Sequence, residues 1–232
     1  AVTVNVTNVN EAPVISGLSS TISVDENDTA AVTVSASDPE SGTLTYSLSG
    51  TDSSSLSISS SGVITFNSAP DYETKTSYSI TVDVSDGTNT TSQSLTVNIT
   101  NLNDNNPVIS GLSSSISIDE NDSSVVSVSA TDADGESLSY SLTGTDASSL
   151  SISYTGVITF NSAPDYETKT SYSITVNVSD GTNTTSQQLT ININDITESG
   201  LPPGSYDPNV YTTAETLNGG TGNDTMYGYD GD

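Results

Sequence analysis

The sequence predicts an all-β protein in which two similar β-sandwich domains follow one another and an irregular tail ends the chain. Apolar residues alternate with Ser and Thr, as in Ile80-Thr81-Val82-Asp83-Val84, which is typical of strands with one buried face. Residues 13–18 recur at 107–112, and this offset of 94 (107 − 13) continues without a gap to about residue 196. A period near 94 fits a complete sandwich of about 100 residues better than a solenoid repeat of about 20–50.

Seven strands are expected in each copy. In the first copy they cover 14–24, 30–37, 43–49, 55–59, 62–67, 77–85 and 92–100, and the second copy repeats them 94 residues further on. Turn signals such as Ser41-Gly42, Ser61-Gly62 and Asp86-Gly87 separate the strands. No segment has convincing helical periodicity, so we predict two seven-stranded sandwiches.

The repeat also predicts the domain boundaries. Residues 1–11 are interpreted as the last strand and linker of a preceding repeat, because 2–10 resembles 95–103. The first repeat then spans 12–104 and the second spans 105–198. Pro202-Pro203-Gly204 begins a linker, so 199–232 is predicted to be a mostly irregular tail. We expect the chain to be a segment of a longer array.

The composition excludes several classes of protein. Lys and Arg number 2 against 29 Asp and Glu, for a net charge of −27, and the chain has no His or Cys. Such an acidic chain repels nucleic acids, and it has no thiol or imidazole for catalysis. No apolar run approaches the roughly 18 residues of a membrane span, and no signal peptide is recognisable. We predict a protein that is not an enzyme and has no disulfides.

The acidic residues gather at the ends of the predicted strands. They form the short clusters Asp25-Glu26, Asp71-Tyr72-Glu73, Asn101–Pro107, Asp132-Ala133-Asp134 and Asp180-Gly181. In two sandwiches joined end to end, these clusters meet at the junction. One interpretation is a solvated acidic surface, and the other is a cation site. About eight converging carboxylates with almost no bases to pair with them favour Ca²⁺, which takes six to eight oxygen ligands.

Four of these clusters resemble the calcium motifs of cadherin repeats. The segment 101–107 is similar to the DxNDNxP connector, and Asp71-Tyr72-Glu73 is similar to the DRE motif. Asp132-Ala133-Asp134 resembles the DxD motif, and Asp25-Glu26 resembles the N-terminal glutamate motif. They occur in the family's order, and the resemblance covers 1–198. It implies Greek-key sandwiches with about three Ca²⁺ at the central junction.

The resemblance also implies a ligand set for each ion. The first ion takes Glu26, Asp71, Glu73 and Asp104, and the second takes Glu26, Glu73, Asp104, Asp134 and the carbonyl of Leu102. The third takes Asn103, Asp132, Asp134, Asp180 and the carbonyl of Asn105. Two features depart from the family. Asn101 replaces the first Asp of the connector, which removes a charge near the second ion, and the loop after Asp134 is too short to assign its usual carbonyl ligand.

Two further groups resemble half of a junction. Near the start, Asn10, Asp38, Glu40 and Asp86 match the third-ion set, with a connector one residue shorter than the central one. Near the end, Glu120, Asp165, Glu167, Asp195 and Glu198 match the first and second sets. We expect fewer ions at these half-sites than at the central junction.

The tail contains a different motif. Residues 219–227 resemble the glycine-rich nonapeptide of RTX repeats, and 228–232 begin a second copy. A phosphate loop is the competing interpretation, but no Lys or Arg follows the glycines. This motif resembles the repeats of bacterial proteins that are exported by type I secretion, which implies a secreted or cell-surface parent protein.

The sequence therefore predicts a calcium-rigidified extender or adhesion module of a large bacterial adhesin. Its partners are expected to be neighbouring repeats of the same chain, with a cell-surface protein or polysaccharide as the target of the whole protein. The isolated segment is expected to be a monomer. The alternative is a module that itself recognises a carbohydrate or another protein. Asp71 and Glu73 are not interpreted as glycosidase carboxylates, because they recur at Asp165 and Glu167 within a metal motif.

Overall fold

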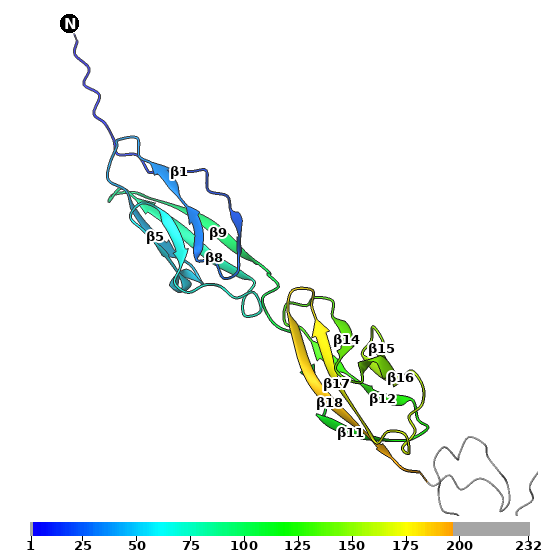
Figure 1. Cartoon of the computed structure of the whole chain (residues 1–232). Helices are drawn as coiled ribbons and strands as arrows, with labels where there is room; N and C mark the ends of the chain where they lie inside the picture. Colours follow the sequence, from blue (N-terminus) through cyan, green and yellow to red (C-terminus); the bar gives the residue numbers. More distant parts are fainter. Residues whose placement is uncertain (1, 197–232) are drawn as a thin grey trace, which may run out of the picture.

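The computed structural model describes residues 2–196, which form two elongated β-sandwiches arranged end to end (Figure 1). The first repeat contains β1 (Val14–Ser16), β2 (Thr21–Asp25), β3 (Ala30–Thr33), β4 (Ser35–Ser37), β5 (Thr45–Ser49), the 3-10 helix η1 (Ser53–Ser55), β6 (Leu56–Ile58), β7 (Val63–Phe66), β8 (Ser77–Ser85) and β9 (Thr90–Thr100). The second contains β10 (Val108–Ser110), β11 (Ser115–Asp119), β12 (Ser124–Ser127), β13 (Ser129–Thr131), β14 (Ser139–Thr143), η2 (Ala147–Ser149), β15 (Leu150–Ile152), β16 (Val157–Phe160), β17 (Ser171–Ser179) and β18 (Thr184–Asn194).

The strands of each repeat lie in two layers. One layer of the first repeat is a four-stranded sheet in the order β2-β9-β8-β5, in which β2 and β9 are parallel and the other pairs are antiparallel. The other layer contains the sheet β3-β7-β6 and the pair β1-β4. The second repeat has the same order, with β11-β18-β17-β14 facing β12-β16-β15 and β10-β13. The all-β prediction of two tandem sandwiches is confirmed.

Two of the predicted strands are interrupted. The segment 14–24 divides into β1 and β2, which pair in different sheets, and Gly17 turns the chain between them with a φ of 71°. The segment 30–37 divides into β3 and β4 at Val34, whose N–H donates to the carbonyl of Gly62 (2.8 Å). A Cβ at Gly62 would lie 2.4 Å from the carbonyl oxygen of Val34, so only glycine fits this approach.

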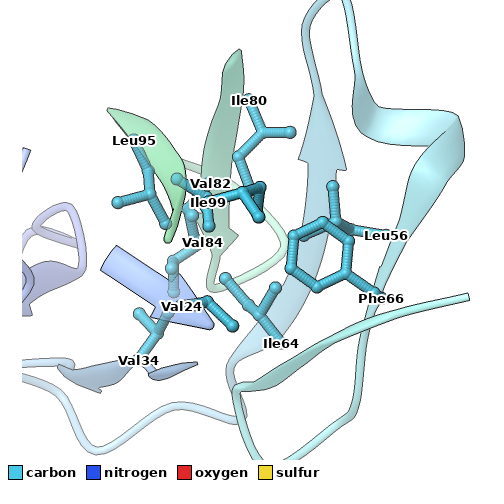
Figure 2. Packing of buried hydrophobic residues seen from close by; sticks show 11 residues of the cluster. Val24, Val34, Leu56, Ile64, Phe66, Ile80, Val82, Val84, Leu95 and Ile99 are labelled. Atoms are coloured by element: carbon cyan, nitrogen blue, oxygen red, sulfur yellow. The ribbon is translucent and has the colours of Figure 1, made fainter. Parts of the chain in front are cut away.

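Each sandwich has its own apolar core. In the first repeat, the inward residues of β8 (Ile80, Val82 and Val84) meet those of β9, and Ile64 and Phe66 face them from β7 (Figure 2). The exposed fraction of Ile64 and of Val82 is 0%. The second repeat buries the equivalent residues in a separate cluster. The alternation of these strands therefore places their apolar side chains between the sheets and leaves Ser and Thr in water.

The two Lys residues stabilise equivalent places in the two cores. The Lys75 ammonium forms an ion pair with Asp52, the residue before η1, and lies 4.8 Å from the ring centroid of Tyr78. The Tyr78 ring in turn packs edge-on against Phe66, with ring centroids 5.0 Å apart. Lys169 makes the same contacts with Asp146 and Tyr172. Each Lys is thus paired with an Asp of its own repeat, and neither lies near the acidic connector in the sequence.

Residues 2–13 precede β1 and contain no strand, and Val2, Val4 and Val6 are exposed. Within the described part of the chain, no helix has the length and apolarity that a membrane span requires. Glu198 and the RTX-like residues 219–232 lie outside the described residues.

Candidate metal centre

The junction between the repeats gathers acidic side chains from both of them. Glu26 follows β2, and Glu73 lies in the turn before β8. Asp104 lies in the connector, and Asp134 follows β13 in the next repeat. These four residues each place one carboxylate oxygen within 4.8 Å of the others. We call them the central cluster.

Glu26 ties the connector to its own repeat. Its side chain is 2% exposed, and both of its oxygens accept hydrogen bonds from backbone N–H groups. Oε1 accepts from Leu102 (2.7 Å) and Oε2 accepts from Tyr72 (2.8 Å). A buried carboxylate needs such partners because desolvation penalises its charge. Glu26 is therefore a fixed acidic group facing the junction.

Asp134 makes the corresponding contacts from the second repeat. Its Oδ2 accepts from the backbone N–H groups of Asp104 (3.1 Å) and Asn105 (2.8 Å). Its backbone carbonyl accepts from the Asn101 side-chain amide (2.8 Å). Burial opposes ionisation of Asp134, but the hydrogen bonds from Asn105 and Asp104 outweigh it, and the pKa of Asp134 is lowered. Asp134 is thus held ionised against the connector.

The amide of Asn105 lies among the carboxylates of the central cluster. Its Nδ2 donates to Asp134 Oδ1 (2.7 Å) and Asp104 Oδ1 (2.9 Å), and it reaches Glu73 Oε2 at 3.4 Å. Burial raises the pKa of Glu73, and the nearby charges of Glu26, Asp134 and Asp71 raise it further. The partial positive charge of the Asn105 NH₂ group therefore lies among several carboxylates.

Asp71 lies at the same junction without joining the central cluster of four. It lines a pocket together with Glu26, Asn27, Glu73, Asp104, Asn105 and Ala133. Its carboxylate accepts hydrogen bonds from the backbone N–H (3.2 Å) and the hydroxyl (2.9 Å) of Thr74. These bonds, with the hydroxyl bond the strongest influence, lower the pKa of Asp71. Asp71 is thus an ionised group at the edge of the pocket.

A second group of carboxylates lies on the side of the second repeat. Asp132, Asp134 and Glu136 each bring one oxygen within 4.8 Å of the other two, so Asp134 belongs to both groups. Asp180 is 8% exposed, and its Oδ1 accepts from the backbone N–H groups of Thr182 and Asn183 (2.6 Å each). The side-chain amide of Asn183 donates to the carbonyl of Asn105 (3.1 Å) and reaches Asn103 Oδ1 at 3.4 Å. These bonds link Asp180 to the connector.

Hydrogen bonds link residues of the predicted half-site near the start. Asn10 Nδ2 donates to Asp86 Oδ2 (2.8 Å), and the backbone N–H of Glu11 donates to Glu40 Oε2 (3.0 Å). Asp38 Oδ1 accepts from the backbone N–H of Glu40 (2.9 Å). The segment before β1 is therefore attached to loops of the first repeat that are equivalent, 94 residues earlier, to the loops of the second repeat that hold the central connector.

The half-site near the end gathers, among the described residues, three carboxylates of the second repeat. Glu120, Glu167 and Asp195 place one oxygen each within 4.8 Å of one another. Glu120 repeats the bonding of Glu26, because it accepts from the backbone N–H groups of Tyr166 and Ile196 (3.0 Å each). Asp165 accepts hydrogen bonds from Thr168, as Asp71 does from Thr74.

Sequence reasoning did not identify three residues of these sites. Asn27 has a φ of 66° and donates a hydrogen bond to Asp104 Oδ2, and Asn183 bridges Asp180 to the connector. Glu136 is the third. The recurrence of Asp-Glu-Asn-Asp at 25–28 and 119–122, and of Asp-Gly-Thr-Asn at 86–89 and 180–183, was the available signal for the two Asn residues.

Known proteins resemble this chain in sequence and in fold. Residues 114–194 match the family described as Cadherin domain, and residues 10–100 match the family described as Bacterial Ig domain. Mouse cadherin-23 EC22-24 superimposes with a TM-score of 0.72 and 25% identity, over 81% of this chain and 68% of that one. No curated protein sequence matches the chain.

Two other solved structures show the same likeness. Human protocadherin-24 EC1-2 superimposes with a TM-score of 0.68 and 25% identity, over 81% of this chain and 100% of that one. Drosophila N-cadherin EC1-4 gives a TM-score of 0.71 at 21% identity, over 80% of this chain and 50% of that one. The described residues 2–196 therefore have the fold of two tandem cadherin-like repeats.

Proposed function

We propose that this chain is an extender module whose junctions are stiffened by Ca²⁺, within a large secreted or cell-surface bacterial adhesin. The observation that carries the proposal is the convergence of carboxylates from two sandwiches on one short connector. Glu26 and Glu73 come from the first repeat, Asp104 from the connector, and Asp134 from the second repeat. A cation bound there contacts all three parts of the chain at once.

Oxygen atoms without partners support a cation at this junction. Asn101 Oδ1, Asp132 Oδ2 and Asp180 Oδ2 are shielded from solvent and have no hydrogen-bond partner. Buried polar atoms are almost always satisfied, so such atoms call for a ligand. All three are oxygen acceptors, which is the ligand type of Ca²⁺. The residues present therefore fit the ion that the cadherin-like fold implies.

Each ion has a proposed set of ligands. The first ion would be held by Glu26, Asp71, Glu73 and Asp104. The second would be held by Glu26, Glu73, Asp104, Asp134 and the Leu102 carbonyl. The third would be held by Asn103, Asp132, Asp134, Asp180 and the Asn105 carbonyl. Asn101, whose side-chain oxygen has no hydrogen-bond partner, is available beside the second. The bound ions would supply positive charge that offsets the repulsion between these carboxylates.

The polar character of the junction explains why ions would control its stiffness. The two apolar cores are separate clusters, and neither includes connector residues. Leu102, the large apolar residue of the connector, is 38% exposed. Without an apolar interface, coordination bonds become the main constraint on the angle between the sandwiches. An array of such junctions would form a rod that holds a distal binding domain away from the cell.

Two observations support a bacterial, extracellular parent. The first repeat matches a Bacterial Ig domain family, and residues 219–227 resemble an RTX nonapeptide. We propose export by type I secretion and a target that is a cell-surface protein or polysaccharide bound elsewhere in the parent. The chain has no proposed catalytic role.

Calorimetry of the whole chain in EGTA and in millimolar Ca²⁺ tests this function. An ion that binds only the folded junction stabilises it by about 4 kcal/mol at a thousand-fold excess over its Kd. We expect a large rise in melting temperature, together with a titration that counts about three ions at the central junction and fewer at the half-sites. An identical melt in both buffers would contradict the calcium function.

A further inference from the structure

We propose that Glu136 is a ligand of the third calcium ion and supplies a carboxylate that the equivalent site of the first repeat lacks. The proposal rests on the proposed calcium function and deepens it. It predicts that the two third-type sites of this chain differ in affinity because one of them has an additional charged ligand.

The position of Glu136 follows from the short loop after Asp134. Gly135 adopts a left-handed conformation (φ 85°), which returns the chain toward the residues just before it. One carboxylate oxygen of Glu136 consequently lies within 4.8 Å of oxygens of both Asp132 and Asp134. Three acids from five consecutive residues thus converge on one point.

Unsatisfied oxygens indicate that this point binds a cation. Glu136 Oε2 and Asp132 Oδ2 are shielded from solvent and accept no hydrogen bond. The same holds for Oδ2 of Asp180, a residue that is 8% exposed. Asp180 Oδ1 accepts from the backbone N–H of Asn183, whose side-chain amide donates to the carbonyl of Asn105, so Asp180 lies at this end of the connector. A buried acid with an unpartnered oxygen beside other acids is costly unless a cation compensates it.

The first repeat shows what the site looks like without this ligand. Gly42 occupies the position of Glu136 (136 − 94), and Asp38 and Asp86 occupy those of Asp132 and Asp180. A Cβ built at Gly42 would lie 3.4 Å from Asp38 Oδ1 and 3.9 Å from Asp86 Cβ. A side chain at this loop position therefore starts directly beside the two acids of the third-type site.

The two loops place their glycines differently. In the first repeat Ser41 takes the left-handed conformation (φ 59°) and glycine follows it. In the second repeat glycine itself takes that conformation, and the next position carries the acid. The second repeat consequently offers Asp132, Asp134, Glu136 and Asp180, whereas the first offers only Asp38, Glu40 and Asp86. Because the number of charged ligands tunes calcium affinity, the central site should be the tighter one.

A calcium titration of the full chain followed by NMR tests the role of Glu136. The amide signals of Gly135 and Gly181 report the central third site, and those of Gly42 and Gly87 report its counterpart. Glu136→Gln should weaken binding at the central site by at least about tenfold and leave the counterpart unchanged. Asp83→Asn is the matched control, because it removes one charge outside the described clusters and copies Asn177 of the second repeat.

The reciprocal exchange tests the same idea as a gain of affinity. The double variant Ser41→Gly/Gly42→Glu copies the loop of the second repeat and should tighten binding at the first-repeat site. A melt in EGTA verifies that each variant is folded. If wild type binds Ca²⁺ and Glu136→Gln binds it with the same affinity at the central third site, the role of Glu136 is refuted while the calcium function stands. The same conclusion follows if Asp83→Asn loses as much affinity at that site as Glu136→Gln. If wild type binds no Ca²⁺, the calcium function itself fails.

Discussion

Replacing Glu26 by Gln separates the structural role of this side chain from its proposed role as a shared ligand. Glu26 accepts two backbone hydrogen bonds and also belongs to the central cluster. Glu120 accepts the equivalent pair of bonds in the second repeat, and within the described part of the chain its cluster consists of Glu120, Glu167 and Asp195, all from that repeat. Glu120→Gln is therefore a matched control, because it loses the same hydrogen bonds but fewer calcium contacts.

The structure sets the size of the two effects. In EGTA, each substitution replaces one acceptor oxygen by an NH₂ group that faces a backbone N–H, which costs about 1–3 kcal/mol of stability. In Ca²⁺, Glu26→Gln additionally weakens the first and second ions. A tenfold loss at each of two ions corresponds to about 1.4 kcal/mol per ion, or about 3 kcal/mol together. The stabilisation by Ca²⁺ should thus fall more for Glu26→Gln than for Glu120→Gln.

Calorimetry of both variants in EGTA and in millimolar Ca²⁺ measures the difference. For a domain of this size, 1 kcal/mol shifts the melting temperature by about 4–8 °C, so the expected gap between the variants is well resolved. The variants should match in EGTA and diverge in Ca²⁺. Equal losses of calcium stabilisation in the two variants would refute the assignment of Glu26 as a ligand shared by two ions.

Two further predictions concern charge. Lys75→Met removes the ion pair with Asp52 and the contact with the Tyr78 ring. It should lower the free energy of unfolding by about 1 kcal/mol, by the same amount in EGTA and in Ca²⁺. A changed calcium titration would contradict the separation of this ion pair from the junction. Burial and neighbouring carboxylates raise the pKa values of Glu73 and Glu136. The folded apoprotein therefore retains protons on these two groups at a pH at which the unfolded chain releases them. The stability that these bound protons contribute is lost as the pH rises through the raised pKa values. In EGTA, urea should therefore unfold the chain less readily at about pH 5 than at about pH 7. In Ca²⁺ the order should reverse, because protons compete with the ion for its ligands. A chain that is more stable at about pH 7 than at about pH 5 in EGTA would show that the acids do not repel one another.

The sequence was sufficient to predict the architecture because its signals are local and repeated. Alternation defines each strand, and the offset of 94 shows that the strand set occurs twice. The interruptions at Gly17 and Val34 were not predicted, because period-two alternation does not reveal which sheet a strand joins. The close approach of Gly62 to Val34 joins positions 28 residues apart (62 − 34), which a turn signal alone does not indicate.

The site was predictable where acidic motifs mark it and unpredictable where amides or loop shape contribute. Glu26, Glu73, Asp104 and Asp134 were expected to meet, and the structure brings them together. Asn183 acts as a hydrogen-bond donor, and a search for acidic ligands does not find donors. Glu136 has no acidic counterpart in the first repeat, so comparison of the repeats gave no reason to choose it.

Small-angle X-ray scattering of the chain with and without Ca²⁺ tests the extender mechanism most directly. In EGTA, the repelling carboxylates and the polar connector should let the two sandwiches pivot, which gives a broad distribution of dimensions. In Ca²⁺, the maximum dimension should become longer and better defined while circular dichroism shows unchanged sandwiches. High salt should not reproduce this change, because screening within about 8 Å provides no coordination bonds. The same broad distribution in both buffers would contradict the extender mechanism.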